Sequence, residues 1–218
     1  MARAIQTDRF EFERALWNQG VMRIAGVDEA GRGPLAGPVV AAAAVLPAKW
    51  AESGLPRSLE GLNDSKQLTR MQREKFFAFL TSCGEVEFAV ARIDAAQIDV
   101  LNILRATHHA MNAALSKLSP APQHVLVDGR AVKTIRIPQT AIVKGDARSY
   151  SIAAASVLAK VMRDRLMLEL DRRWPVYGFA AHKGYGTARH LAAIAAHGPC
   201  PIHRRSFAPL KPVERKLF

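Results

Sequence analysis

Apolar residues along this chain gather in short runs, and polar or glycine- and proline-rich segments separate them. Short apolar runs between turn signals are typical of buried β-strands. The runs that we expect to form strands are residues 23–27, 39–46, 87–93, 124–127 and 141–143. A turn rich in glycine and proline joins the first two runs, which favours an antiparallel hairpin.

Between these runs, apolar residues recur at helical spacing. We expect helices over residues 69–82, from Asp94 to about 118 with an interruption near Asn102, over 151–174 and over 187–196. The apolar positions expected to face inward on the first two are Met71, Phe76, Phe79, Leu80, Ile103, Leu104, Met111, Ala114 and Leu115. Residues 49–68 are expected to form a polar loop. Alternating strands and helices predict an α/β fold, in which helices cover a sheet.

Charge narrows the class of partner. The chain of 218 residues carries a formal net charge of +12 at 49% apolar content, so it is a globular protein with a large basic excess. Such an excess favours a polyanion, with nucleic acid as the first candidate, although it also serves solubility. An anionic membrane surface is the alternative, but no long basic amphipathic helix supports it.

The cysteines and the apolar runs indicate where the protein works. Cys83 and Cys200 form neither a disulfide framework nor a zinc pattern. The N-terminus lacks the apolar region of a signal peptide, and the longest apolar run, residues 39–47, is too short to span a bilayer. We therefore expect a soluble cytoplasmic protein.

The most informative feature is the pair Asp28 and Glu29, which ends an apolar run and precedes the turn Gly31-Arg32-Gly33. Adjacent carboxylates repel each other and are expensive to bury, so a cation between them would relieve both costs. Hard cations such as Mg²⁺ prefer oxygen ligands. The turn offers backbone N–H groups and one cation, which suit a phosphate. The pattern predicts metal-assisted chemistry on a phosphodiester.

Two further acids follow apolar runs, namely Asp128 before Gly129 and Asp146 after Lys144 and Gly145. Alone, Asp128 is typical of an Asp-Gly turn, and Asp146 of an acid at a helix N-terminus. Together with the first pair they predict a carboxylate site for one or two Mg²⁺ or Mn²⁺ ions at neighbouring strand ends.

Several basic or aromatic residues are candidates for substrate contacts. Lys66, Lys144 and Lys183 can meet phosphates, and Tyr185 can stack on a sugar or base, although each also fits an ordinary surface loop. The histidines have no common zinc spacing. Residues 153–156 are small and suit core packing, and Asp164 suits an ion pair. The basic tail, which holds Arg204, Arg205, Lys211, Arg215 and Lys216, suits phosphate binding or solubility.

These residues also form a set of motifs in a fixed order. The motifs are GVDEAGRGPLAGPV at 26–39, NDSKQL at 63–68, VDG at 127–129, KGD at 144–146, SIAAASVLAKVMRD at 151–164, HKGYGT at 182–187 and PIHRRSF at 201–207. Together they resemble type 2 ribonuclease H, specifically the bacterial ribonuclease HII family. The resemblance covers nearly the whole chain. The first twenty residues have no counterpart that we can assign.

The resemblance implies a ribonuclease H-like mixed sheet flanked by helices, with a helical C-terminal part. It implies a single catalytic domain over 1–218 with its core at about 21–207, a short N-terminal extension and a basic C-terminal tail. A monomer is expected, and any replication-protein partner is unknown. The ribonuclease HIII type has a sizeable N-terminal extension, which the roughly twenty residues before the core disfavour.

The resemblance also implies the chemistry. The carboxylates Asp28, Glu29, Asp128 and Asp146 would bind Mg²⁺ or Mn²⁺, while Gly31, Arg32, Gly33 and Tyr185 would recognise the ribonucleotide at an RNA–DNA junction. The expected enzyme degrades RNA in RNA–DNA hybrids and nicks duplex DNA 5′ to embedded ribonucleotides, leaving 3′-hydroxyl and 5′-phosphate ends. Its expected role is removal of misincorporated ribonucleotides. The alternatives are a noncatalytic hybrid-binding module and a related nuclease that acts on DNA alone.

Overall fold

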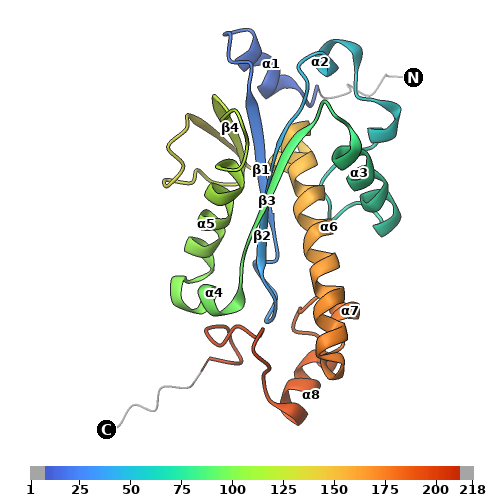
Figure 1. Ribbon diagram of the computed structural model, residues 1–218, viewed down its shortest axis with the longest axis vertical. Helices are drawn as coiled ribbons and strands as arrows, with labels where there is room; N and C mark the ends of the chain where they lie inside the picture. The colour runs from blue at the N-terminus through green and yellow to red at the C-terminus, as the bar shows by residue number, and fades with distance from the viewer. Residues whose placement is uncertain (1–7, 212–218) are drawn as a thin grey trace, which may run out of the picture.

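A five-stranded mixed sheet forms the centre of the computed structural model, which describes residues 8–211 (Figure 1). Its strands are Ile24–Ala30 (β1), Val39–Val45 (β2), Glu87–Ile93 (β3), His124–Asp128 (β4) and Gln139–Ile142 (β5). The order across the sheet is β3-β2-β1-β4-β5, in which β1, β2 and β3 pair antiparallel and β4 and β5 run parallel to β1. The predicted hairpin and mixed α/β sheet are confirmed.

Strand β1 extends further than the sequence predicts. Asp28 lies opposite Ala42 and Glu29 opposite Ala41, so the ladder with β2 continues through both acids to Ala30. The prediction that the acid pair follows the strand is therefore wrong, because backbone pairing with β2 holds both residues in extended conformation. Asp128, which was also expected just past its strand, is the last residue of β4.

Helices surround the sheet. The α-helices are Glu11–Trp17 (α1), Trp50–Ser53 (α2), Arg70–Ser82 (α3), Ala95–Leu101 (α4), Ile103–Leu115 (α5), Tyr150–Arg173 (α6), Phe179–His182 (α7) and Ala188–His197 (α8). The 3₁₀ turns are Arg57–Leu59 (η1), Gly145–Ala147 (η2) and Pro175–Tyr177 (η3). Helix α1 was not predicted, and α2 and η1 lie in the segment expected to be a loop. The predicted break at Asn102 is confirmed, since its φ of 66° separates α4 from α5.

The two faces of the sheet carry different helices. Alternate residues of β2 point to opposite faces, so Val40, Ala42 and Ala44 pack with α6 and α3 while Ala41 and Ala43 pack with α5. Figure 1 shows α3 and α6 on one side of the sheet and α4 and α5 on the other. The small side chains of β2 let both layers of helices approach closely.

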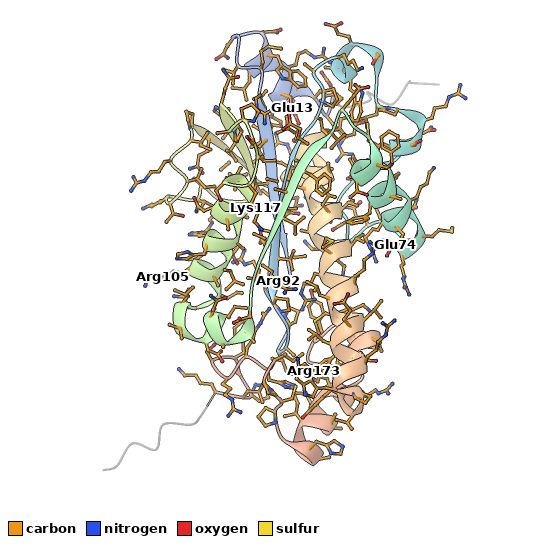
Figure 2. The ribbon with its side chains drawn as sticks, viewed as in Figure 1. Glu13, Glu74, Arg92, Arg105, Lys117 and Arg173 are labelled. Atoms are coloured by element: carbon orange, nitrogen blue, oxygen red, sulfur yellow. The ribbon has the colours of Figure 1, made fainter. Side chains whose placement is uncertain are left out.

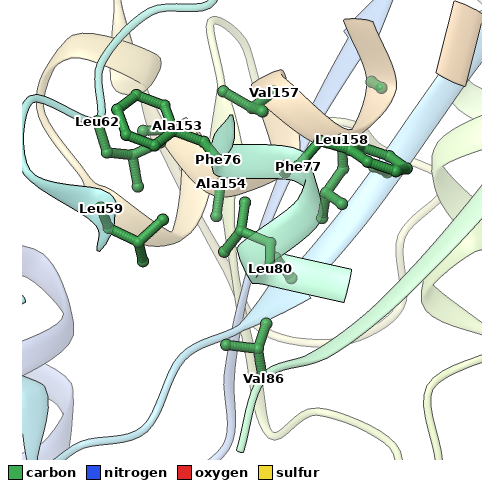
Figure 3. Close-up of a cluster of buried hydrophobic side chains, with 14 of the residues drawn as sticks. Leu59, Leu62, Phe76, Phe77, Leu80, Val86, Ala153, Ala154, Val157 and Leu158 are labelled. Atoms are coloured by element: carbon green, nitrogen blue, oxygen red, sulfur yellow. The ribbon is translucent and has the colours of Figure 1, made fainter. Parts of the chain in front are cut away.

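The larger core cluster lies between α3, α6 and the sheet. Figure 3 shows Phe76, Phe77 and Leu80 of α3 against the alanines at the start of α6. Helical spacing misplaced two other residues that it expected inside. Met71 is 81% exposed and Leu104 is 52% exposed, because no described element covers those turns of α3 and α5.

The C-terminal part packs at one end of the long helix α6. The elements η3, α7 and α8 form a separate hydrophobic cluster there around Met167, Tyr177 and Phe179. A single β-bridge joins Ala36 to His203 and so attaches this part to the turn after β1. The expected helical C-terminal part is confirmed; Arg215 and Lys216 of the predicted basic tail lie outside the described residues. Within 8–211, no helix is long and apolar enough to cross a membrane.

Candidate active site

Three of the predicted carboxylates converge at one edge of the sheet. Asp28, Asp128 and Asp146 each offer an oxygen within 4.8 Å of the others. The pairing of Val27 with Val127 explains the first two, because neighbouring parallel strands point residues of equal register to the same face. The sequence could not show that β1 and β4 are neighbours, because about a hundred residues separate them.

Asp146 reaches this corner from the η2 turn. Lys144 has a left-handed φ of 55°, which turns the chain back after β5. The backbone N–H of Gly145 then donates a hydrogen bond of 2.7 Å to Asp128 Oδ1. This bond ties the turn to the end of β4 and places Asp146 beside Asp128. The expected position of Asp146 beyond the fifth strand holds, with a 3₁₀ turn in place of a helix start.

The carboxylates repel each other in a poorly hydrated place. Burial, followed by the charges of Glu29 and Asp128, raises the pKa of Asp28 well above its usual value. Burial and the charge of Asp128 raise the pKa of Asp146 to about 6. A divalent cation would remove this repulsion, and three carboxylate oxygens at this spacing are the donor set that Mg²⁺ and Mn²⁺ take. The residues therefore fit a hard divalent cation.

Glu29 lies apart from this group. Consecutive strand residues point to opposite faces, so Glu29 faces away from the side on which Asp28 lies. Its carboxylate pairs with Arg32 at 3.2 Å. Burial raises the pKa of Glu29, while Arg32 opposes the shift. The structure thus brings three of the four predicted carboxylates together and leaves the fourth in an ion pair at the border of the site.

A cavity of about 530 Å³ has Glu29 in its wall and lies next to the converging aspartates through Lys66 and Ser156. It is lined by Glu29, Ala30, Gly31, Arg32, Gly33, Ser65, Lys66, Ile103, Ser156, Lys160, Arg163 and Tyr185. A Cβ placed on Gly33 would lie 3.7 Å from Tyr185 Cε1, so the glycine turn and the tyrosine face each other. Tyr185 is 48% exposed, which leaves its ring available to a ligand. The residues predicted to read the ribonucleotide lie together.

Arg163, a fully buried residue of α6, supports the turn from below. Its guanidinium donates to the carbonyls of Ala36, Pro38 and Lys183 at 3.0–3.2 Å. A Cβ on Gly31 would lie 2.0 Å from Arg163 Nε, so only glycine fits at that position. Burial lowers the pKa of Arg163 to about 10, which still leaves it charged at neutral pH.

Arg204 holds the other side of the same turn, so its assignment to a basic tail for phosphate binding or solubility is wrong, because its side chain is buried against backbone carbonyls. It is fully buried, and its guanidinium donates to the carbonyls of Gly31, Arg32 and Gly37. Burial, followed by the charge of Arg163, lowers the pKa of Arg204 to about 9. Two buried cations therefore support this region: Arg204 satisfies the carbonyls of Gly31 and Arg32, and Arg163 satisfies carbonyls of the segment that follows.

A chain of histidines holds Tyr185. His190 Nδ1 lies 2.9 Å from the Tyr185 carbonyl and must donate to it, so His190 Nε2 accepts from His203 Nε2 at 3.0 Å. His203 Nδ1 then accepts from the Cys200 N–H at 3.0 Å. Both rings are neutral in this arrangement. Burial lowers the pKa of His190, and burial with the charge of His190 lowers the pKa of His203 to about 4.

The predicted lysines occupy different places. Lys66 lines the cavity, and although partial burial opposes its charge, the attraction of Asp28 and other acids raises its pKa. Lys183 Nζ donates to the Ala180 carbonyl and borders a neighbouring groove. Lys144 is exposed beside η2. Only Lys66 lies in the cavity with the glycine turn.

Sequence reasoning missed the residues that support the site. Ser156 was assigned to core packing, but its hydroxyl donates to Ser65 at 2.9 Å and borders the cavity. Arg163 lies in helical register with Ala159 and Met167, both buried, so the period alone would have placed it inside. The expected ion pair of Asp164 is present, with Lys160 at 2.8 Å.

Comparison with known proteins gives a consistent result. The sequence model described as Ribonuclease HII matches residues 25–210. Ribonuclease HII of Desulfitobacterium hafniense is 51% identical over 96% of this chain and 79% of its own length. Ribonuclease HII of Geobacillus kaustophilus is 55% identical over 93% of this chain and 74% of its own length.

Solved structures agree. The ribonuclease H2 of Pyrococcus horikoshii is similar with a TM-score of 0.69 and 31% identity, over 87% of this chain and 95% of the other. The matched range contains the three converging carboxylates, the glycine turn, Tyr185 and the two buried arginines. The chain belongs to the ribonuclease HII family, the type 2 ribonucleases H, and is an endoribonuclease.

Proposed function

We propose that this enzyme cuts RNA–DNA hybrids and nicks duplex DNA on the 5′ side of embedded ribonucleotides. One observation carries the proposal: Asp28, Asp128 and Asp146 converge beside Lys66 and Ser156, and these two residues line a cavity that also contains the glycine turn facing Tyr185. A site for metal-assisted phosphodiester hydrolysis thus adjoins a site that can read a sugar. The proposed products carry 3′-hydroxyl and 5′-phosphate ends. The proposed role is the removal of misincorporated ribonucleotides from DNA.

The carboxylates hold the metal, and the chain supplies the geometry. Bound Mg²⁺ or Mn²⁺ would activate water and neutralise charge on the phosphate. The Gly145 N–H fixes Asp128, and Ser156 forms a hydrogen bond that favours the charged form of Asp28. Glu29, paired with Arg32, is a fourth carboxylate at the border that a second ion can recruit.

The turn and the tyrosine provide the discrimination between RNA and DNA. Only the 2′-hydroxyl distinguishes a ribonucleotide from its DNA neighbours. Because Arg204 takes up the carbonyls of Gly31 and Arg32, the backbone N–H groups of the turn can serve as donors to that hydroxyl. The exposed ring of Tyr185 can stack on the adjacent sugar. Lys66, Lys144 and Lys183, with the net charge of +12, add affinity for phosphates that depends on salt rather than on sequence.

The test is cleavage of a DNA duplex with one embedded ribonucleotide, with Mg²⁺ or Mn²⁺, beside an all-DNA duplex. We expect one nick 5′ to the ribonucleotide, absent in the all-DNA duplex and absent with EDTA. Equal cutting of both duplexes would point to a nuclease that acts on DNA alone. Tight binding without cleavage in either metal would point to a noncatalytic binding module.

We also infer that the chain works as a single catalytic domain and as a monomer in the cytoplasm. One sheet, rather than two, organises residues 8–211, and both parts of the site depend on it. Sedimentation of the active enzyme should give one species near 23.9 kDa. A stable dimer that alone has activity would contradict this inference.

A further inference from the structure

The segment before β1 lies outside the residues that the family model matches, yet it contacts the metal-site corner. The match begins at residue 25, whereas α1 and the residues just before it pack where α6 begins. Phe10 lies 4.8 Å from the Tyr150 ring, and the Arg9 carbonyl accepts a bond of 3.1 Å from the Tyr150 N–H. The segment therefore contacts the first residue of α6, which follows the η2 turn that carries Asp146.

Arg9 connects two loops of the site. One Nη atom donates to the Asp146 carbonyl at 2.7 Å, and the other donates to the carbonyl of Leu62. Leu62 begins the loop that carries Lys66 into the cavity. The guanidinium also lies 4.7 Å above the Tyr150 ring, which fixes its plane. Since each guanidinium nitrogen has a fixed direction, this bridge sets the spacing between the two loops.

Glu13 secures the other end of the Asp146 turn. It is fully buried in α1, and its Oε1 accepts from the Ser149 hydroxyl at 2.7 Å and the Ser151 N–H at 3.1 Å. Ser149 caps α6 and Ser151 lies in its first turn, where free N–H groups favour an acceptor. Figure 2 shows Glu13 at the end of the molecule where α1 and the start of α6 meet. The N-terminal segment therefore holds Asp146 itself through Arg9 and the residues after it through Glu13.

From these contacts we infer that Arg9 and Glu13 are positioning residues for Asp146, so that the N-terminal segment is part of the metal site's support. The inference rests on the proposed function, because it assumes that Asp146 holds the metal. Neither residue touches a phosphate or a metal. They fix the backbone at and after a carboxylate that would otherwise turn away from its repelling neighbours.

The test compares Arg9→Met with the matched control Arg14→Met. Arg14 is also an arginine of the N-terminal segment, but it bonds to Asp8 and to the Ala51 carbonyl, away from the metal corner. Mn²⁺ binding to the whole protein without nucleic acid is measured by calorimetry, and cleavage is measured against Mg²⁺ concentration. Loss of a supporting contact typically weakens metal binding about 10- to 100-fold.

For Arg9→Met we expect the Mn²⁺ dissociation constant and the Mg²⁺ midpoint to rise about tenfold, with cleavage at saturating Mg²⁺ close to that of the unaltered enzyme. For Arg14→Met both values should stay unchanged. A lower melting temperature with unchanged metal binding would show a merely structural role and overturn the inference. If Arg9→Met does not fold, Arg9→Lys serves, because lysine keeps the charge but cannot bridge both carbonyls.

Two further variants separate this inference from the function on which it rests. Glu13→Gln keeps the acceptor oxygen and should bind Mn²⁺ normally, whereas Glu13→Ala should bind it more weakly. Equal binding by these two variants would overturn the role of Glu13. Asp146→Asn should lose Mn²⁺ binding; if it does not, the proposed metal site itself fails, whatever the result for Arg9.

Discussion

The carboxylate corner and the glycine turn adjoin each other but are built on opposite electrostatic plans. The buried Asp28 and Asp146 meet the half-buried Asp128 at the corner, and burial with the repulsion between neighbouring carboxylates raises the pKa of Asp28 and of Asp146. At the turn, two buried arginines find backbone carbonyls for their donors. Under the proposed function, the recognition site is arranged in advance, whereas the catalytic site needs a bound cation.

This difference implies that the two parts can be disabled separately. Changes at the corner should act on metal binding and on the rate of cleavage. Changes at the turn and at the histidine chain should act on the discrimination between ribonucleotide and deoxyribonucleotide. Each of the following experiments compares the two parts, beginning with the largest expected effect.

Asp128→Asn should reduce cleavage about a thousandfold, because the metal loses a charged ligand and with it several kcal/mol of charge stabilisation. Binding of the ribonucleotide duplex should persist, since one repelling charge is gone and the turn is intact. Single-turnover cleavage and fluorescence anisotropy measure the two properties. Full activity in this variant would remove Asp128 from the site.

Arg204→Met should lower the free energy of unfolding by about 3 kcal/mol, because carbonyls of the turn lose charged donors in a buried place. The preference for the ribonucleotide duplex should fall with it, while Mn²⁺ binding stays the same. Arg205→Met is the matched control, since that side chain is exposed. Weakened Mn²⁺ binding in Arg204→Met alone would show that the two parts are not separable.

Tyr185→Ala should weaken cleavage by about 10- to 100-fold, the worth of one stacking contact at about 1–3 kcal/mol. Tyr185→Phe should retain most of the activity because the ring remains. The comparison of kcat and KM on both duplexes checks this. If Phe and Ala variants are equally impaired, the hydroxyl rather than the ring makes the contact.

The two parts should contribute to the pH dependence of the folding stability with opposite signs. Asp146, with its pKa raised to about 6 from 3.8, binds a proton more readily when folded, so its part of the stability grows as pH falls from 6 towards 3.8. His203, with its pKa lowered to about 4 from 6.5, is neutral when folded, so its part is full above 6.5 and is lost as pH falls towards 4.

Urea unfolding between pH 7 and pH 5 measures the sum of these opposed terms, each about 1–3 kcal/mol at most. Saturating Mg²⁺ should remove the carboxylate term and leave a steeper loss of stability with acid. His203→Asn should flatten the loss. A pH profile that Mg²⁺ leaves unchanged would mean that the corner does not hold the cation.

The sequence predicted the strands and most of the residues proposed for the site. It did not predict which segments, distant in the sequence, lie next to each other in the fold. Asp28 and Asp128 were recognisable because apolar runs precede them, yet their proximity depends on β1 pairing with β4, which is a non-local contact. The misplaced Met71 and Leu104 have correct helical spacing, but spacing does not reveal whether another element covers a turn.

The supporting residues were harder to predict for a different reason. Arg163 and Arg204 bond to backbone carbonyls, which every residue carries, so no complementary side chain identifies their partners. The same holds for Arg9, whose partners are the carbonyls of Leu62 and Asp146. Patterns of residue types indicate charged partners well and backbone partners poorly.

The contact between β1 and α6 limits how the enzyme can vary. A Cβ on Gly26 would lie 2.1 Å from the backbone carbon of Ser151, so no side chain can be inserted without separating the strand of Asp28 from the helix that follows Asp146. A Cβ on Gly84 would meet nothing within 4 Å. In a library of random substitutions selected for activity, position 84 should accept many residues, and position 26 should return glycine alone.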